Sequence, residues 1–535
     1  MNRLLSKPRH SLAAFVLPLL LAACGGGGGG GGDSGGSPIT PTPPIVVVPP
    51  VEVLQPSSSF AQRCAPGNPD APSASKTGSL SIEKQWLRSY FDEAYLWRDE
   101  VPVVDAGAAV FSGSDVSAAL SNYFDALLST QRTDSGALRD RFSFIMPTAE
   151  WTALADSGID VGYGIEWQVD VPTATTQRRV RIASVEPGSA AANSGLKRGY
   201  ELYVVNGVVA TTTDKVGRDT LYGALYPSRA GTANDFIFIN AGSYTLSAAA
   251  IAKNPVPLRQ VLTAADGAKV GYLVFNDHNV PSESKLIEAV THFKAQAVSD
   301  LVLDLRYNGG GYLFIASELA YMIAGPTRVG SQVFERLSYN SRRSTETSNT
   351  PFYSTSCQLS SNRCTSAQPL PTLNLARVFV LTQSGTCSAS ESVINGLRGV
   401  GVDVIQIGGK TCGKPYGFTA RDNCGVSYFP IEFVGSNAKG FGDYSDGFEP
   451  VAAALSSGRK LPGCTVDDDF SRALGDSSEA MLAGAMSYRS TGVCPIRTGA
   501  SASLTKAQAA LMGEGAVAMD LRRSPARSNR ILGGR

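Results

Sequence analysis

This chain of 535 residues has few histidines, almost no net charge and few long apolar runs. Its three histidines are His10, His278 and His292, so few side chains are available as the usual base for a hydroxyl nucleophile. The formal net charge of +1 gives no electrostatic case for a nucleic-acid partner. Because no Cys-x-x-Cys pair or His/Cys cluster occurs, we predict no metal site. The long apolar stretch at the start stands alone, which excludes a polytopic membrane protein.

The first 24 residues have the pattern of an export signal. A basic segment precedes SLAAFVLPLLL, an apolar core too short to span a bilayer. The following LAAC resembles a bacterial lipobox, which implies a lipid-modified Cys24 and a protein of the bacterial cell envelope. Gly25 stands where a retention signal has Asp, which implies an outer-membrane anchor facing the periplasm. An ordinary secretory signal with a chance cysteine is the alternative.

Nine cysteines are present, and eight remain when Cys24 is assigned to lipidation. An even number of cysteines in an exported chain favours disulfides over metal binding. Three pairs are close enough in sequence for local bridges, namely Cys357/Cys364, Cys412/Cys424 and Cys464/Cys494. That pairing leaves Cys64 and Cys387, whose fate the sequence does not decide.

Composition and periodicity divide the remaining chain into five segments. Residues 25–75 are rich in Gly and Pro, which is typical of a linker. Residues 76–157 show helical spacing of apolar residues, whereas 158–252 consist of short β-rich segments. In 253–464, apolar strands alternate with helices, which predicts a sheet covered on both faces. We expect the extension 465–535 to be partly disordered, and the predicted fold class is α/β with several domains.

The β-rich segment resembles a PDZ domain. Its EPGSAAANSGLKRG (186–199) is similar to the family's turn, short helix and glycine stop, although Tyr200 stands where the family commonly has Asp. The loop Gly162-Tyr163-Gly164-Ile165 matches the carboxylate-binding loop of that family. Such a loop offers backbone N–H groups to a chain terminus while an extended peptide adds a strand beside it. A small β domain with purely structural glycines is the alternative.

Ser388 lies where a strand-like run, ARVFVLT, gives way to a helical pattern. In an α/β layer, ligands gather at the carboxyl ends of strands, where helix N-termini favour a developing oxyanion. With histidine scarce, a neutral lysine is the alternative base, and burial favours the neutral amine. The next strand, VDVIQIGG, delivers both Lys410 and Lys414, and the physics does not choose between them.

The segment SGTCSASE (384–391) resembles the nucleophile motif of the carboxyl-terminal (tail-specific) processing peptidases, serine peptidase family S41. The resemblance implies that Ser388 is the nucleophile and that Lys414, at the end of a G-x-x-x-x-G-K match, is the general base. LDLRYNGGGYL (303–313) is similar to a second family motif, which implies an oxyanion hole formed by the N–H groups of Gly310 and Ala389. The likeness runs in family order from about residue 80 to 455.

Two positions depart from the family pattern. Phe418 stands where many members have a glutamine that orients the base, and Cys387 replaces a usual alanine beside the nucleophile. A disulfide that brackets the base is one way to hold Lys414. We expect Asp304, Arg306 and Asn308 to organise their turn, Glu391 to stabilise the helix start, and the two later histidines to have no catalytic role.

The resemblance implies a serine endopeptidase that cleaves unstructured or C-terminal segments of exported proteins through a Ser–Lys dyad and an acyl-enzyme. This mechanism needs no metal and no cofactor. Its expected partners are polypeptides with exposed C-terminal tails and, through the lipid anchor, a membrane. Two non-catalytic alternatives on the same scaffold are a PDZ adaptor and a protein that binds apolar ligands. Neither needs both Ser388 and Lys414, which favours the peptidase.

Overall fold

The computed structural model describes residues 54–170, 177–360, 363–365, 367–495 and 530–531. The predicted signal peptide, Cys24 and the Gly-rich run lie outside these residues. Within them, no helix combines the length and the apolar character needed to cross a bilayer.

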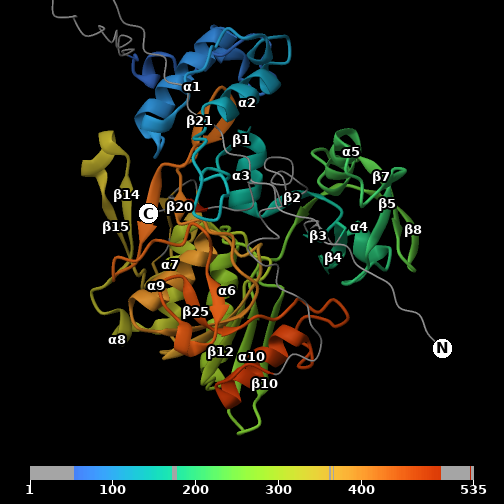
Figure 1. Cartoon of the computed structure of the whole chain (residues 1–535), viewed down its shortest axis with the longest axis vertical. Coiled ribbons are helices and arrows are strands. Elements are labelled where there is room, and N and C mark those ends of the chain that lie inside the picture. The colour runs from blue at the N-terminus through green and yellow to red at the C-terminus, as the bar shows by residue number, and fades with distance from the viewer. Residues whose placement is uncertain (1–53, 171–176, 361–362, 366, 496–529, 532–535) are drawn as a thin grey trace, which may run out of the picture. The chain divides into compact units, whose positions relative to one another are not determined.

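The largest sheet has seven strands and lies in the lower part of Figure 1. All neighbours pair in parallel except its first two strands, which are antiparallel. The middle strands are buried along nearly their whole length, which explains their near-continuous apolar sequences. From edge to edge the strands are β10 (Leu258–Thr263), β11 (Lys269–Val274), β12 (Asp300–Asp304), β18 (Arg377–Thr382), β19 (Asp403–Gly408), β25 (Lys460–Cys464) and β24 (Glu449–Val451).

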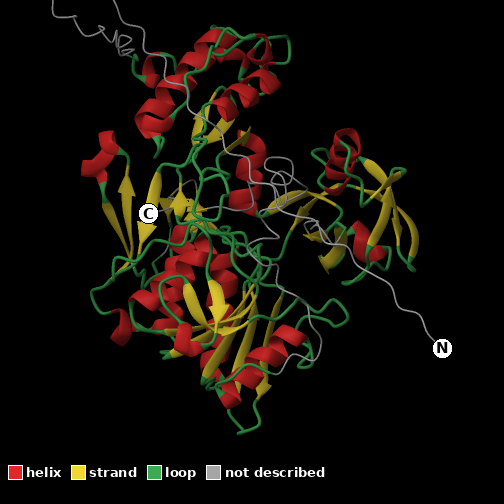
Figure 2. Ribbon diagram, in the orientation of Figure 1, coloured by secondary structure: helices red, strands yellow, loops and turns green. Residues whose placement is uncertain are grey.

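Helices cover both faces of this sheet (Figure 2). Leu301 and Leu303 of β12 share a core with α6 (Ser282–Ala295), α7 (Leu313–Ala324) and α9 (Ala389–Gly399). The intervening Val302 shares the opposite core with α10 (Ala480–Thr491). Each such buried side chain contributes about 1.5–3 kcal/mol relative to exposure. The predicted α/β layer is confirmed, and α10, from the segment predicted as an extension, completes it.

The segment before the β-rich domain is helical, as predicted. It contains α1 (Leu80–Ala94), α2 (Val116–Ala126) and α3 (Thr148–Ser157). Ser79 and Asp115 cap the first two helices by accepting a hydrogen bond from a backbone N–H. The predicted linker 25–75 extends too far, since residues 54–75 contain two helical turns and the buried Cys64, which is bonded to Cys424.

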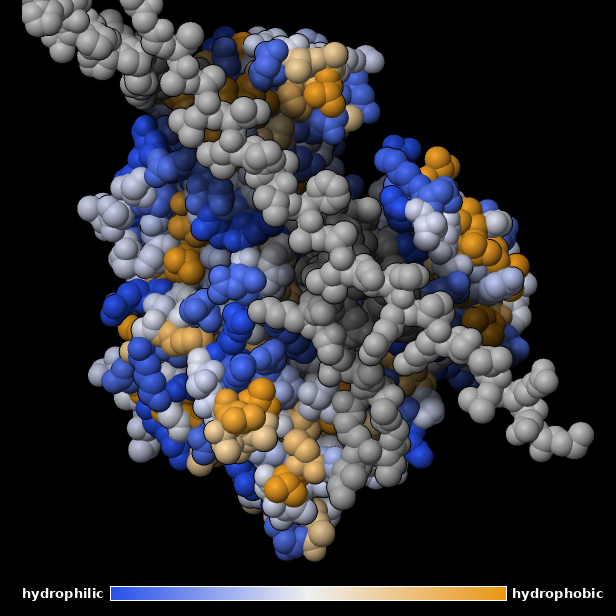
Figure 3. All heavy atoms as spheres, viewed as in Figure 1, coloured by the Kyte–Doolittle hydropathy of each residue, from blue (hydrophilic) through white to orange (hydrophobic). Residues whose placement is uncertain are grey.

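The β-rich domain has its own hydrophobic core, built around Trp167, Leu221 and Phe236. Its elements are β2 (Ile159–Gly162), β3 (Ile165–Asp170), β4 (Arg179–Val185), α4 (Ala190–Asn193), β5 (Leu202–Val205), β6 (Val208–Val209), α5 (Lys215–Leu225), β7 (Ala233–Phe238), β8 (Gly242–Ser247) and β9 (Ala249–Ala252). On the face of the whole molecule that Figure 3 draws, the described residues are mainly hydrophilic, and the hydrophobic residues lie in small separate groups.

Short strands complete the structure around the carboxyl ends of the seven-stranded sheet. They pair as β1-β22-β21, β15-β14-β23-β20, β16-β17 and β13-β26. Their bounds, with that of one short helix, are β1 (Phe144–Pro147), β13 (Gly311–Tyr312), α8 (Pro326–Val329), β14 (Val333–Tyr339), β15 (Ser348–Pro351), β16 (Leu359–Ser360), β17 (Arg363–Cys364), β20 (Tyr416–Gly417), β21 (Arg421–Asn423), β22 (Val426–Phe429), β23 (Phe433–Ser436) and β26 (Arg530–Ile531).

Candidate active site

Ser388 occupies the turn between β18 and α9, where it is the N-cap of the helix. Its backbone has φ 60° and ψ −114°, a left-handed conformation that costs a non-glycine residue about 1–3 kcal/mol. The side chain is fully buried, and its Oγ has no hydrogen-bond partner among the described residues. A strained strand-to-helix turn with an unsatisfied hydroxyl is typical of a nucleophile position.

The two lysines after β19 lie in different environments. Lys410 is exposed, whereas Lys414 is fully buried. The amine of Lys414 lies 4.5 Å from the ring centre of Phe418 and 5.2 Å from that of Phe142. The ring that replaces the family's glutamine therefore packs against the amine. Burial penalises the charged amine, and the ring faces offset part of that penalty.

Glu391 connects the serine turn to the lysine loop. Its carboxylate accepts hydrogen bonds from the backbone N–H groups of Ser388 at 3.0 Å, Gly413 at 2.9 Å and Lys414 at 2.8 Å. It also accepts the hydroxyl of Thr411 at 2.5 Å. Burial raises the pKa of Glu391, while these donors oppose the rise. The predicted role of Glu391 at the helix start holds, but the lysine-loop contacts extend it.

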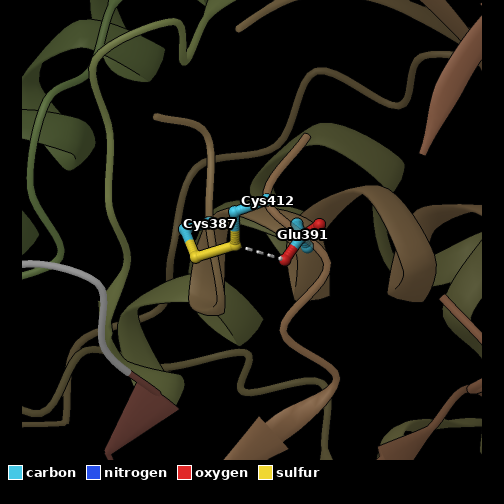
Figure 4. A group of neighbouring side chains, drawn as sticks. All are labelled: Cys387, Glu391 and Cys412. Carbon is cyan, nitrogen blue, oxygen red and sulfur yellow. Dashed lines mark hydrogen bonds between the residues drawn. A yellow bond between two sulfur atoms is a disulfide. The ribbon is translucent and has the colours of Figure 1, made fainter. Parts of the chain in front are cut away.

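A disulfide between Cys387 and Cys412 joins the same two segments (Figure 4). Cys412 Sγ lies 3.3 Å from Glu391 Oε2, and the two sulfurs and this carboxylate form a compact group. Because the sulfurs are bonded to each other, they act as a cross-link here. The residue beside the nucleophile is thus covalently tied to the segment that carries Lys414.

The observed pairing corrects one predicted disulfide. Cys357–Cys364 and Cys464–Cys494 are present as predicted. The predicted Cys412/Cys424 bridge is wrong, because Cys424 is bonded to Cys64. The physical reason is that β18 and β19 are parallel neighbours, so the residues after their carboxyl ends meet. Proximity along the chain was a weaker guide than proximity across the sheet.

The glycine loop after β12 lies beside the serine turn. Gly310 and Gly311 have φ of 105° and 141°, which favours glycine at both positions. The N–H of Gly310 donates to Asn308 Oδ1 at 2.9 Å, and the Asn308 carbonyl accepts the N–H of Cys387 at 3.1 Å. Gly310 can therefore stabilise an oxyanion only after Asn308 releases its N–H. The N–H of Ala389 has no acceptor among the described residues.

His278, predicted to have no catalytic role, is fully buried against this loop. Its ring Nδ1 donates to Asn308 Oδ1 at 3.1 Å, because that oxygen already serves as an acceptor. Its backbone N–H donates to the Gly310 carbonyl, and its own carbonyl accepts from Tyr312. Burial lowers the pKa of His278 to about 3, while the bonds to Asn308 and Gly310 oppose the fall. In the described part of the chain, no hydrogen bond joins it to Ser388. His278 therefore supports the glycine loop.

Arg306, at the base of the same loop, is buried among carboxylates. Its guanidinium lies 2.9 Å from Asp304, 2.7 Å from Asp468 and 2.8 Å from Glu479. Although burial opposes the shift, Arg306 and Arg198 lower the pKa of Asp468. A buried arginine requires such pairing. The expected role in organising the turn therefore extends to α10, because Glu479 is its N-cap.

The PDZ-like loop Gly162–Ile165 lines a pocket together with Leu225, Tyr226, Ile251 and Lys253. Tyr163 itself turns inward, and its hydroxyl donates to the Ala224 carbonyl at 3.0 Å. Lys253, which sequence reasoning missed, lies 3.1 Å from Asp160 and 3.5 Å from Glu166. The only signal for it was a lysine just after the predicted domain. Asp160 lines the pocket as well, so the pocket combines loop backbone with a lysine whose charge this carboxylate balances.

Two family models match the sequence. The model described as peptidase family S41 matches residues 269–422, and the peptidase S41 N-terminal domain matches residues 83–144. The chain belongs to peptidase family S41. The first match contains Ser388, Lys414, Gly310 and Ala389, and this S41 chain is a serine-type peptidase. Neither match covers residues 145–268, so the PDZ-like character of the β-rich domain stays a prediction.

Solved structures of S41 proteins have a similar fold. A putative S41 protease from Bacteroides fragilis NCTC 9343 is 22% identical with a TM-score of 0.56, and the alignment covers 76% of this chain and 97% of that one. The photosystem II D1 C-terminal processing protease is 18% identical with a TM-score of 0.41, over 69% and 92% of the two chains. The first likeness establishes the fold of this S41 peptidase. A comparison with curated proteins gives no match.

Proposed function

We propose that this S41 peptidase cleaves unstructured or C-terminal segments of exported polypeptides with a Ser388–Lys414 dyad. The observation that carries the proposal is that two independent links, a shared carboxylate and a disulfide, join the serine turn to the lysine loop. Glu391 accepts N–H groups from both Ser388 and Lys414, and the Cys387–Cys412 disulfide joins their segments. The chemistry needs this fixed relation, because proton transfer and attack depend on sub-ångström placement.

In the proposed mechanism, the neutral amine of Lys414 accepts the proton of Ser388 Oγ as that oxygen attacks the scissile carbonyl. The N–H groups of Ala389 and, once released by Asn308, Gly310 stabilise the oxyanion, each contributing about 3–4 kcal/mol. The lysine then gives its proton to the leaving amine, which departs and leaves an acyl-enzyme. Water, deprotonated by the same amine, releases the acyl group.

Substrate tails would enter with their terminus in the pocket of the Gly162–Ile165 loop. Backbone N–H groups of such a loop favour a carboxylate. Lys253 at the pocket wall is paired with Asp160 and Glu166, so the proposed recognition rests on the loop backbone. We also propose that Cys24 carries the lipid that places the enzyme at the outer membrane, facing the periplasm. In that location, exported polypeptides are the accessible substrates.

The direct test is cleavage of an unstructured peptide that ends in apolar residues. Wild type should cleave it, Ser388→Ala should not, and Ser384→Ala should match wild type because that serine is exposed in the same segment. Binding without cleavage by all three proteins would favour the PDZ adaptor. Equal cleavage by all three would remove Ser388 from the mechanism.

A further inference from the structure

The segment Arg530–Ile531 forms a strand at the candidate active site. This strand, β26, pairs in parallel with β13, where Arg530 lies opposite Gly311 and Ile531 opposite Tyr312. β13 begins directly after Gly310. β26 also contacts β20 (Tyr416–Gly417), which begins two residues after Lys414. The segment therefore lies against both the glycine loop and the lysine loop.

Pairing with β26 occupies one edge of β13, which is only two residues long. On its other side, β13 forms a single parallel bridge with His278. An unpaired strand edge accepts an extended polypeptide of almost any sequence, because the main-chain N–H and C=O groups supply the hydrogen bonds. A substrate whose scissile carbonyl approaches the N–H of Gly310 is an extended chain, and it meets this same edge.

We propose that Arg530–Ile531 occupies the strand subsite of the substrate and competes with it in cis. The inference rests on the proposed function, because β13 is a substrate subsite only if Ser388 attacks a peptide nearby. The partner of the β13 edge is thus the C-terminal part of this chain, and a substrate strand must displace it. If the segment is docked nine-tenths of the time, the apparent KM rises about tenfold while kcat is unchanged.

The test uses two variants of the full chain. Arg530→Pro with Ile531→Pro removes both backbone N–H groups, so any ladder bond that β26 donates is lost. Arg530→Ala with Ile531→Val keeps both N–H groups and serves as the matched control. We expect the proline variant to show a lower KM for a short unstructured peptide at unchanged kcat. The control should retain the high KM of wild type.

A synthetic peptide RSNRILGGR, which copies residues 527–535, provides the second arm. Added to the proline variant, it should restore the high KM competitively, and its analogue with prolines at the two strand positions should not. Equal KM values for wild type and both variants would overturn the proposal, while cleavage that depends on Ser388 would leave the proposed function intact.

A binding measurement covers the case in which no cleavage occurs. Both variants are made with Ser388→Ala, and the short unstructured substrate peptide is labelled with a fluorophore. This peptide should bind more tightly to the chain that carries the two prolines than to the control chain. Equal affinities would overturn the inference about β26 independently of catalysis. Tighter binding without any cleavage by the chain with Ser388 would support the inference about occupancy and refute the proposed peptidase chemistry.

Discussion

Removing the Cys387–Cys412 disulfide should impair catalysis far more than removing a disulfide of similar loop length elsewhere. The change is Cys387→Ala with Cys412→Ala, which frees the serine turn from the lysine loop. The matched control is Cys464→Ala with Cys494→Ala, which cuts the bond between β25 and the segment after α10. The two bridges have sequence separations of 25 and 30 residues.

The chain-entropy relation gives both losses about the same size, close to 3.5 kcal/mol of unfolding free energy each. The effects on activity should differ, because only the first bridge joins the segments that carry Ser388 and Lys414. A displacement of about 1 Å between reacting groups costs about 100-fold in rate. We therefore expect kcat/KM to fall about 100-fold in the first variant and less than about threefold in the control.

Urea denaturation midpoints and kcat/KM for an unstructured peptide, measured at a temperature where both variants are folded, test this prediction. Similar midpoints with unequal activities support the reasoning. An equal fall in kcat/KM for both variants, or full activity in the Cys387/Cys412 variant, would show that the cross-link does not position the dyad.

Two further predictions concern buried groups beside the dyad. Glu391→Gln should lower kcat/KM more than tenfold, because hydrogen bonds to a charged acceptor contribute about 1.5–3 kcal/mol each. The control is Glu283→Gln, which alters a buried carboxylate that accepts the N–H of Gln358 at 2.7 Å and should leave activity in the same peptide assay unchanged. Equal losses in both would remove the special role of Glu391. The pKa of His278 is about 3 in the folded chain, below its ordinary value of 6.5, so the unfolded chain binds more protons between these two values. The free energy of unfolding should therefore fall as the pH is lowered through that window, by up to about 1.4 kcal/mol per pH unit. Urea titrations from pH 7 to 4 should show a shallower fall in the free energy of unfolding for His278→Gln. Parallel curves for wild type and variant would contradict the lowered pKa of His278.

The sequence predicted the parts of the fold that depend on local patterns. Apolar runs such as that of β18, separated by helical segments, were sufficient for a sheet covered on both faces. Disulfides within a short stretch, such as Cys357–Cys364, also followed from spacing alone. The layer formed by α10 was not predicted, because nothing local distinguishes a helix that packs on the sheet from one in a loose extension.

The contacts that hold the site depend on which strands are neighbours. The sequence placed Ser388 and the two lysines at adjacent strand ends. The same adjacency of β18 and β19 brings Cys387 and Cys412 together, which their spacing along the chain does not reveal. The sequence predicted only that Glu391 stabilises the start of its helix, because a carboxylate in the first turn needs no other segment for that role. Its bonds to Gly413 and Lys414 come from a loop more than twenty residues away. Such contacts need the fold first.

The most direct test of the Ser–Lys dyad compares Lys414→Met with Lys410→Met. Methionine keeps a long apolar side chain in both places while it removes the amine. In single-turnover cleavage of an unstructured peptide, we predict that Lys414→Met loses acylation of Ser388 and that the exposed Lys410→Met acylates at the wild-type rate. Rapid acylation by Lys414→Met, or its loss in Lys410→Met alone, would contradict the assignment of Lys414 as the base.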